Sequence, residues 1–279
     1  MLHSDETSDG GVAALGAQDL GRALCIVSGA SRGFGRALAA QAAALLRPGS
    51  VLLLVSRSGD RLRELQAHIG ASSGGRDGLH VRCVVADLGE QRGVEETLRV
   101  VKESAAADMM EHLLLVNNAA SLGDVSRFAT SFTDLSEVNH YLSLNVSSAL
   151  SLTAAVLSVF PRRPGLRRTV VNISSLCALQ PFPSWVLYCT GKAARDMMFR
   201  VLAVEEPDLR VLSYAPGPLD TEMQVQARVN TGDPNLRSTI STMQAQGQLL
   251  TCEESSAKLI KVLLEDSYQS GAHLDFYDL

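Results

Sequence analysis

The sequence has little charge, few aromatic residues and no strong excess of either sign. Charged residues make up 20% of its 279 residues and aromatic residues 5%, with a single tryptophan. The net charge is −5, so there is no basic field that would attract nucleic acid. No uninterrupted apolar run approaches the roughly 20 residues that span a bilayer, so no membrane partner is expected.

The cysteines are few, scattered and odd in number, and no Cys-x-x-Cys pair occurs. They are Cys25, Cys83, Cys177, Cys189 and Cys252. This pattern favours reduced thiols over a disulfide framework, and it offers no set of ligands for a metal. Residues 1–19 are small and polar and lack the apolar segment of a secretory signal. We expect them to be a mobile leader on a soluble, cytoplasmic protein.

Short apolar runs alternate with helical patterns from residue 20 to the C-terminus. Seven apolar runs predict strands at residues 23–28, 51–56, 81–85, 112–116, 169–173, 210–214 and 273–276. Helical patterns lie at 35–46, 62–69, 94–101, 136–160, 188–204 and 253–264, with weak, broken helical character over 221–250. Apolar strands separated by helices are typical of a parallel sheet covered on both faces. We therefore predict an α/β fold: a single doubly wound (Rossmann) domain over residues 20–279, with about seven strands.

The turn after the first predicted strand is rich in glycine. Its residues are Gly29, Ala30, Ser31, Arg32, Gly33, Phe34 and Gly35. Glycines permit a tight turn and a close approach of the backbone, and the N-terminus of the following helix suits a pyrophosphate. A glycine-rich turn alone is a weak indication, but its place between a strand and a helix strengthens the prediction of a dinucleotide site.

The end of the second predicted strand indicates which dinucleotide is bound. Sites that prefer NAD usually carry an acidic residue there, which binds the ribose 2′-hydroxyl. Here Arg57 and Ser58 are in that place, no acid occurs before Asp60, and Arg32 lies in the glycine-rich turn. Two guanidinium groups that converge on a 2′-phosphate would favour NADP, whereas two solvated surface arginines are the alternative.

Polar residues also follow the third and fourth predicted strands. Asp87, before Leu88, could accept a hydrogen bond from the adenine amino group or cap the next helix. The amides of Asn117 and Asn118 could brace the floor of the cofactor cleft, or they could be ordinary turn residues. Asn145 lies among apolar residues of the predicted helix 136–160. A buried amide needs partners, and a helix distorted there could offer a carbonyl to a water.

Tyr188 and Lys192 are four residues apart at the start of the predicted helix 188–204. That spacing puts a phenol and an ammonium on one helix face, about one turn apart. Ser175 follows the fifth predicted strand, so all three groups can reach one small volume. A nearby cation would move the pKa of Tyr188 from about 10 towards the working range of an acid–base catalyst. By itself, however, Tyr-x-x-x-Lys is usually only a pair on a helix surface.

These features occur in the order found in the short-chain dehydrogenase/reductase family, which the sequence resembles from about residue 22 to the C-terminus. The family has a Gly-x-x-x-Gly-x-Gly turn, an Asp after the third strand, Asn-Asn-Ala-Gly, an Asn within a helix, a Ser, and Tyr-x-x-x-Lys. Ser28 stands where the family mostly has Thr, and Ala120 where it mostly has Gly. Both departures keep a small side chain and remove no catalytic group.

The resemblance implies a role for each matching residue. The catalytic residues would be Ser175, Tyr188, Lys192 and Asn145. The residues in contact with NADP(H) would be Gly29, Ser31, Arg32, Gly33, Phe34, Gly35, Arg57, Ser58, Asp87, Leu88, Asn118, Lys192, Leu219, Asp220, Thr221, Glu222, Met223 and Gln224. NADPH would deliver a hydride to a carbonyl carbon, Tyr188 would protonate the oxygen, and Ser175 would stabilise the developing charge. The resemblance also implies a homodimer built on helices 136–160 and 188–204.

Residues 174–182, 214–221 and 270–278 are similar to those of family members that reduce side-chain carbonyls of pterins in the last steps of tetrahydrobiopterin synthesis. This similarity implies pterin contacts from Ser175, Leu176, Tyr188, Gly217 and Asp275. A carboxylate at Asp275 could accept both N–H groups on the edge of a pterin, although a capping or surface acid is the alternative. A broad carbonyl or steroid reductase and a non-catalytic NADPH-sensing protein also remain open as functions.

A last candidate is a modification site. Arg228 and Thr231 fit a loose Arg-x-x-Thr site for basic-directed kinases, in a segment that we expect to be mobile. A phosphate there would add negative charge near the substrate side. Such matches often occur by chance.

Overall fold

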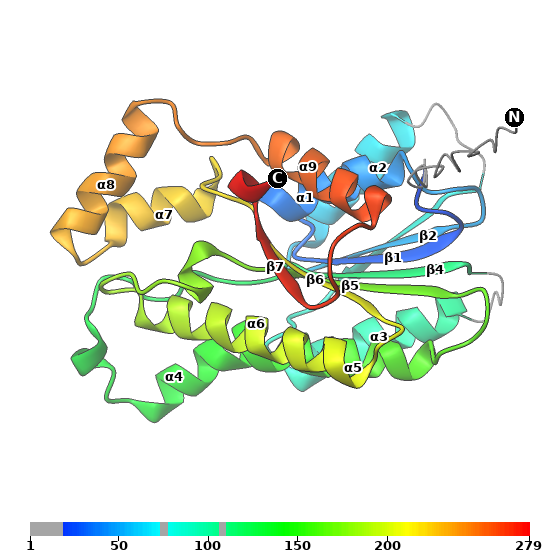
Figure 1. Ribbon diagram of the computed structural model, residues 1–279, viewed down its shortest axis with the longest axis horizontal. Coiled ribbons are helices and arrows are strands. Elements are labelled where there is room, and N and C mark those ends of the chain that lie inside the picture. Colours follow the sequence, from blue (N-terminus) through cyan, green and yellow to red (C-terminus); the bar gives the residue numbers. More distant parts are fainter. Residues whose placement is uncertain (1–18, 73–77, 106–109) are drawn as a thin grey trace, which may run out of the picture.

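The computed structural model describes residues 19–72, 78–105 and 110–279, so the expected leader lies almost wholly outside the described residues. Seven strands form one sheet in the order β3-β2-β1-β4-β5-β6-β7 (Figure 1). The strands are β1 (Ala23–Ser28), β2 (Val51–Ser56), β3 (His80–Val85), β4 (His112–Asn117), β5 (Arg167–Ile173), β6 (Arg210–Ala215) and β7 (Ala272–Asp275). All neighbouring strands are parallel, which confirms the predicted sheet. The order reverses between β1 and β4, where ligands of doubly wound sheets bind.

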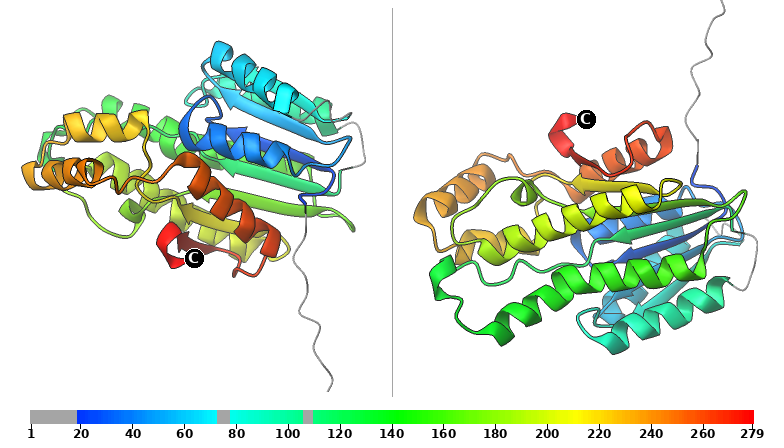
Figure 2. Two further views of the ribbon diagram at one scale, coloured as in Figure 1. Left: turned by 90° about the horizontal axis from the view of Figure 1, so that it is seen from above. Right: turned by 60° about the horizontal axis from the view of Figure 1, so that its bottom comes forward.

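Helices cover both faces of the sheet, as Figures 1 and 2 show. One layer holds α1 (Gly33–Ala43), α2 (Gly59–Ser72) and α9 (Cys252–Glu265), and the other holds α3 (Gln91–Ala105), α5 (Ser148–Val159) and α6 (Val186–Glu205). Alternate strand residues face opposite layers. Cys25 and Val27 therefore belong to the first apolar cluster, and Leu24 and Ile26 to the second.

The predicted helix 136–160 consists of three parts. These are α4 (Leu135–Leu142), the π-helical segment η2 (Ser143–Ser147) and α5. The Asn145 Nδ2 atom donates a hydrogen bond to the carbonyl oxygen of Tyr141 at 2.9 Å, within the wider turn. π-Helical turns are rare and occur frequently at functional sites. The predicted distortion at Asn145 is thus confirmed.

The run Leu135–Val159 is long and apolar enough to cross a membrane, judged by length and composition only. It is not an uninterrupted apolar run, because serines, two asparagines and Glu137 divide it, but its mean hydropathy is high. Its inner side chains, including Leu152 and Val156, are buried in the second apolar cluster. The helix is therefore part of the layer that covers the sheet.

The weakly helical segment after β6 forms two short helices, α7 (Glu222–Asn230) and α8 (Pro234–Ala245). Thr221 caps α7, and Asp233 caps α8 just before a proline at its first position. Both helices lie beyond the carboxyl ends of the strands (Figure 1). Single 3-10 turns complete the fold at η1 (Ala129–Ser131), η3 (Leu176–Ala178) and η4 (Phe276–Asp278).

Candidate active site

The structure brings Ser175, Tyr188 and Lys192 together, as predicted. Ser175 follows β5 and caps η3, where its Oγ accepts a hydrogen bond from the backbone N–H of Cys177 at 3.2 Å. Tyr188 is buried in the first turn of α6. One turn later, the Lys192 Nζ atom lies 5.5 Å from the centre of the Tyr188 ring and donates a hydrogen bond to the carbonyl oxygen of Ile173 at 2.6 Å.

The electrostatics of this group differ from the prediction. Burial raises the pKa of Tyr188 above its usual range, and a side-chain hydrogen bond with Ser175 and the charge of Arg195 only partly oppose this. Burial, followed by repulsion from Arg195, lowers the pKa of Lys192 to about 7. The predicted lowering of the Tyr188 pKa was therefore wrong, because desolvation of the phenolate outweighs the nearby cation. Tyr188 is a phenol at neutral pH and can donate a proton.

Asn145 has all the partners that a buried amide needs. Its Oδ1 accepts from the Ser121 backbone N–H at 2.8 Å, and its Nδ2 donates to the Tyr141 carbonyl and, at 3.3 Å, to the Ser121 hydroxyl. The side chain thus braces the loop after β4. Its backbone carbonyl, in the π-helical segment, remains the predicted water acceptor.

The glycine-rich turn lies directly against the loop after β4. Gly29 and Gly33 have φ angles of +68° and +55°, in the left-handed region that favours glycine. A Cβ atom at Gly29 would lie 2.7 Å from Asn118 Nδ2, and one at Gly35 would lie 2.5 Å from the Gly29 carbonyl oxygen. Asn118 Nδ2 in turn donates to the Ser28 and Gly29 carbonyls at 2.9 and 3.1 Å. The predicted hydrogen bonds from Asn118 to the neighbouring backbone are confirmed, and its place at a cofactor stays a prediction.

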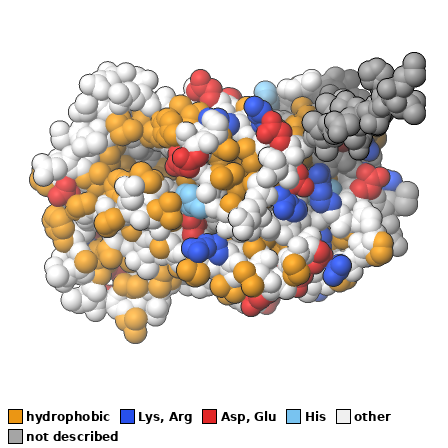
Figure 3. Space-filling model, viewed as in Figure 1, with side chains coloured by type: hydrophobic (Ala, Val, Ile, Leu, Met, Phe, Trp, Pro, Cys, Tyr) orange, Lys and Arg blue, Asp and Glu red, His pale blue; other side chains and the backbone are white. Residues whose placement is uncertain are grey.

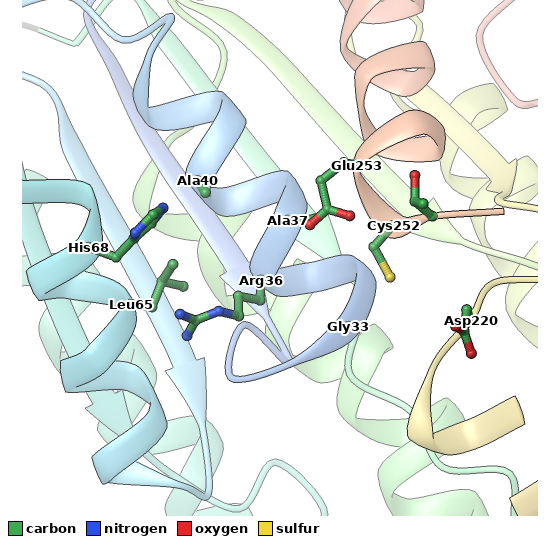
Figure 4. Close-up of a pocket in the computed structure, with 10 residues that line it drawn as sticks. Gly33, Arg36, Ala37, Ala40, Leu65, His68, Asp220, Cys252 and Glu253 are labelled. Carbon is green, nitrogen blue, oxygen red and sulfur yellow. The ribbon is translucent and has the colours of Figure 1, made fainter. Parts of the chain in front are cut away.

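The glycines let this turn pack tightly in front of α1, whose N-terminus suits a pyrophosphate. A pocket of about 330 Å³ lies beside it, between α1, α2 and the start of α9 (Figure 4). Arg36 of α1, His68 of α2 and Glu253 of α9 line it, together with Gly33 and Asp220. The pocket therefore borders the expected cofactor site and does not include Tyr188.

The two arginines expected at the 2′-phosphate are paired with acids. Arg32 forms an ion pair with Glu222 at the start of α7, and Glu222 also lies 3.3 Å from Arg61. Arg57 Nη1 lies 3.6 Å from an Asp87 carboxylate oxygen. All of these side chains are between 38% and 66% exposed, so the pairs are weak and the arginines are available to a ligand.

Asp87 does not cap a helix. Its Oδ1 accepts from the Gly89 backbone N–H at 2.9 Å, and α3 begins only at Gln91. The capping alternative is therefore wrong, and Leu88 beside it is buried. The contact with adenine stays a prediction.

The segment from Leu219 to Gln224 lies between the glycine-rich turn and Tyr188. Thr221 Cγ2 would be 3.4 Å from a Cβ at Gly33, and Met223 Sδ lies 4.0 Å from the Tyr188 hydroxyl. Leu219 forms a bridge with Leu250, which holds the segment in place. Thr221 and Met223, two of the predicted cofactor residues, therefore lie between the glycine-rich turn and Tyr188.

The residues predicted to contact substrate come from three elements. Leu176 is 41% exposed on η3, and Gly217 has a φ of +78° in the loop after β6. Asp275 ends β7, where its Oδ1 accepts from the Tyr277 backbone N–H at 3.0 Å and caps η4. Asp275 therefore does cap η4. Its role as an anchor for a pterin remains a prediction.

Sequence reasoning missed the apolar wall of the site and two charged residues. Trp185 packs edge-on against Tyr188 with ring centres 5.6 Å apart, in a third apolar cluster with Phe182 and residues of α7 and α8. Figure 3 shows hydrophobic side chains gathered at this end of the molecule. The two charged residues are Arg195 and Asp196, which are buried on α6. The signal in the sequence that could have identified them is a pair of adjacent charges within a predicted core helix.

Two further expectations concern metals and Thr231. All five cysteines are free thiols, and the described residues contain no cluster of three or more His, Cys, Asp or Glu side chains that could hold a metal. Thr231 is fully buried at the end of α7, where its hydroxyl accepts from Trp185 Nε1 at 3.0 Å. It therefore lies at the end of a helix and packed against Trp185, which corrects the expectation of a mobile loop.

Comparison with known proteins agrees with this geometry. Residues 23–232 match the short chain dehydrogenase family. The sepiapterin reductase of Meriones unguiculatus is 54% identical over 259 residues, which cover 93% of this chain and 98% of that protein. That of Rattus norvegicus is 54% identical over 260 residues, with the same coverage. The solved KRED1-Pglu enzyme has a TM-score of 0.74 and 26% identity, over 90% of this chain and 99% of that one. The chain belongs to the short-chain dehydrogenase family.

Proposed function

We propose that this chain is an NADPH-dependent reductase of pterin side-chain carbonyls, with sepiapterin as a substrate. The observation that carries the proposal is the meeting of Ser175, Tyr188 and Lys192 beside a glycine-lined cradle, in a chain 54% identical to sepiapterin reductases. The likeness covers 93% of the chain. It supports the pterin over a carbonyl substrate of another class.

The side chains divide the reduction between them. When bound, NADPH supplies the hydride for the carbonyl carbon. The Tyr188 hydroxyl gives its proton to the carbonyl oxygen, for which its raised pKa keeps it protonated. Ser175 donates a hydrogen bond to the same oxygen and stabilises the charge that develops there. Lys192 holds the nicotinamide ribose, and Asn145 holds a water through its carbonyl for return of the proton.

The cofactor site extends from the glycine-rich turn to α7. The cradle of Gly29, Gly33 and Gly35 takes the pyrophosphate. Arg32, Arg57 and Ser58 bind the 2′-phosphate. Each arginine then leaves the half-exposed acidic side chain with which it is paired and contacts the phosphate instead. A doubly charged phosphate competes well with a single carboxylate at such a site. This exchange accounts for a preference for NADPH over NADH.

Asp275 anchors the pterin. It lies half-buried at the carboxyl end of β7, so it faces the same end of the sheet as Ser175. A carboxylate accepts two N–H groups side by side, as the 2-amino and ring N–H edge of a pterin presents them. Aromatic diketones lack that edge and would not use Asp275.

The test is NADPH oxidation with sepiapterin, compared with NADH and with benzil, a simple aromatic diketone. We expect turnover of sepiapterin with a strong preference for NADPH. Tyr188→Phe should lower kcat roughly 100-fold or more, because it removes the general acid and leaves NADPH binding intact. Reduction of benzil without any reduction of sepiapterin would retain the reductase chemistry and overturn the pterin assignment.

We further propose a homodimer formed through α5 and α6, which lie side by side on one face (Figure 2). Their outward side chains include the exposed apolar residues Leu150, Met197, Val201 and Val204. An apolar surface of this kind is suited to a second copy of the chain. Light scattering should give twice the chain mass, and Val201→Glu with Met197→Glu should reduce it to one chain. A monomeric native protein would refute this.

The place of action that we propose is the cytoplasm. Five free thiols, three of them buried, suit a reducing compartment. Cell fractionation tests this, and recovery of the protein only from membranes would refute it.

A further inference from the structure

Four neighbouring strands carry a polar residue at the same register. Asn117 of β4 is opposite Asn172, Asn172 is opposite Ser213 of β6, and Ser213 is opposite His273 of β7. Side chains at one register of a parallel sheet point to the same face. On this face the neighbours are apolar, so a polar row here is costly unless its groups are hydrogen-bonded.

Asp196, on the helix of Tyr188 and Lys192, supplies many of these partners. It is 6% exposed. Its Oδ1 accepts from Asn172 Nδ2 at 2.9 Å and from the Ser174 hydroxyl at 2.5 Å. Its Oδ2 lies 2.5 Å from His273 Nδ1. One carboxylate therefore joins α6 to β5, to the residue before Ser175, and to β7.

Arg195 makes the complementary contacts on the other side of the same row. Its Nε donates to Asn172 Oδ1 at 2.8 Å, and its Nη atoms donate to the carbonyls of Asn117 and Ala119. The adjacent pair Arg195 and Asp196 therefore fixes α6 against three strands.

The row lies directly beneath the site. Ser175 is three residues after Asn172, and Asp275 is two residues after His273. β7 is a four-residue strand at the edge of the sheet, with β6 as its single neighbouring strand. The contact between His273 and Asp196 thus joins the strand of Asp275 to the helix of Tyr188.

We propose that Asp196 and His273 are positioning residues for substrate selection, which fix Asp275 relative to Tyr188. This rests on the proposed anchoring of the pterin by Asp275. A pterin held at one end by Asp275 and protonated at the other by Tyr188 must span a fixed distance. A displacement of about 1 Å can cost on the order of 100-fold in rate. A diketone that contacts only Ser175 and Tyr188 does not depend on β7.

Replacements of His273 can separate this role from general stability. Its Nε2 is buried and has no hydrogen-bond partner within the described part of the chain, so the ring acts through Nδ1. The amide nitrogen of Asn can take the place of Nδ1 and still donate to Asp196. Leu fills similar space and cannot donate. His273→Asn is therefore the matched control for His273→Leu.

The experiment measures kcat and KM for sepiapterin and for benzil in both variants, in Asp275→Asn and in the double variant. We expect His273→Leu to raise the KM for sepiapterin on the order of tenfold and to change benzil turnover less than twofold. His273→Asn should behave as the native protein. The double variant should match Asp275→Asn alone, because His273 acts through Asp275.

Each departure from this pattern is informative. Equal losses for both substrates in His273→Leu, or no loss for either, would overturn the positioning role. An unchanged sepiapterin KM in Asp275→Asn would overturn the proposal that Asp275 anchors the pterin. If His273→Leu still had an effect in that case, His273 would not act through Asp275. If the Asp275 variant is impaired and His273→Leu is not, only the positioning role falls. Should His273→Leu not fold, His273→Ala provides the same comparison.

Discussion

The Lys192 ammonium donates a 2.6 Å hydrogen bond to the carbonyl oxygen of Ile173, the last residue of β5. Ile173 lies two residues before Ser175, and Lys192 lies one turn after Tyr188. This bond therefore ties the helix that carries Tyr188, the proposed proton donor, to the strand that leads to Ser175. It also holds the Lys192 Nζ atom over the Tyr188 ring, 5.5 Å from the ring centre.

The first prediction concerns the pH dependence of catalysis. Because the pKa of Lys192 is lowered to about 7, its positive charge is lost as the pH rises through 7. We expect kcat/KM, which reports on the free enzyme, to decline above about pH 7. Lys192→Arg, which stays charged, should move this decline to higher pH, and Lys192→Met should be far less active. An identical decline in the Arg variant would show that another group titrates.

The second prediction tests the cradle at the start of α1. A Cβ at Gly35 would overlap the Gly29 carbonyl, so Gly35→Ala must displace the turn. Overpacking of this kind costs about 1–3 kcal/mol. We expect the Kd for NADPH, from fluorescence titration, to rise about tenfold or more. Gly70→Ala is the control, because a Cβ there meets nothing within 4 Å. Normal NADPH affinity in Gly35→Ala would argue against the cradle.

The third prediction concerns stability in acid. Burial and the charge of Arg167 lower the pKa of His112 to about 3, and both ring nitrogens have partners, the Leu20 carbonyl and the Thr169 hydroxyl. Below about pH 6.5 the unfolded chain binds a proton that the folded chain excludes. The free energy of unfolding should therefore decrease as the pH is lowered. The decrease is up to about 1.4 kcal/mol per pH unit between about pH 6.5 and pH 3.

His112→Asn lacks the titrating imidazole, so its stability should not show this dependence on pH. The difference in unfolding free energy between this variant and the native protein should therefore shrink as the pH is lowered. Urea unfolding at several pH values measures the difference. His68→Asn, at an exposed position of α2, should follow the native protein throughout. A constant difference between His112→Asn and the native protein would contradict the prediction.

The fourth prediction concerns Thr231. Its hydroxyl is fully buried and donates to the Ala227 carbonyl at 2.7 Å, so a kinase can reach it only when the end of α7 opens. We expect basic-directed kinases to phosphorylate the native chain much more slowly than a peptide of residues 225–235, as followed by mass spectrometry. Thr231→Val identifies the modified residue. Equal rates would mean that this end of α7 is open in solution.

The sequence alone predicted the sheet, the glycine-rich turn and the catalytic group. Apolar runs of strand length between helical patterns leave few arrangements other than a parallel sheet. The carboxyl ends of such strands meet at one edge, so residues placed just after them were expected to come together. Asn145 could be singled out because a buried amide must find partners.

The tertiary structure decided what depends on burial and on distant residues. Desolvation reversed the predicted shift of the Tyr188 pKa, which no spacing of residues reveals. Arg32 meets Glu222 from a distant part of the sequence, and Thr231 is buried by Trp185. Strand register places His273 beside Ser213, and packing of α6 on that row brings Asp196 to His273. Local sequence fixes which groups are present, whereas their charge and geometry follow from what the folded chain packs around them.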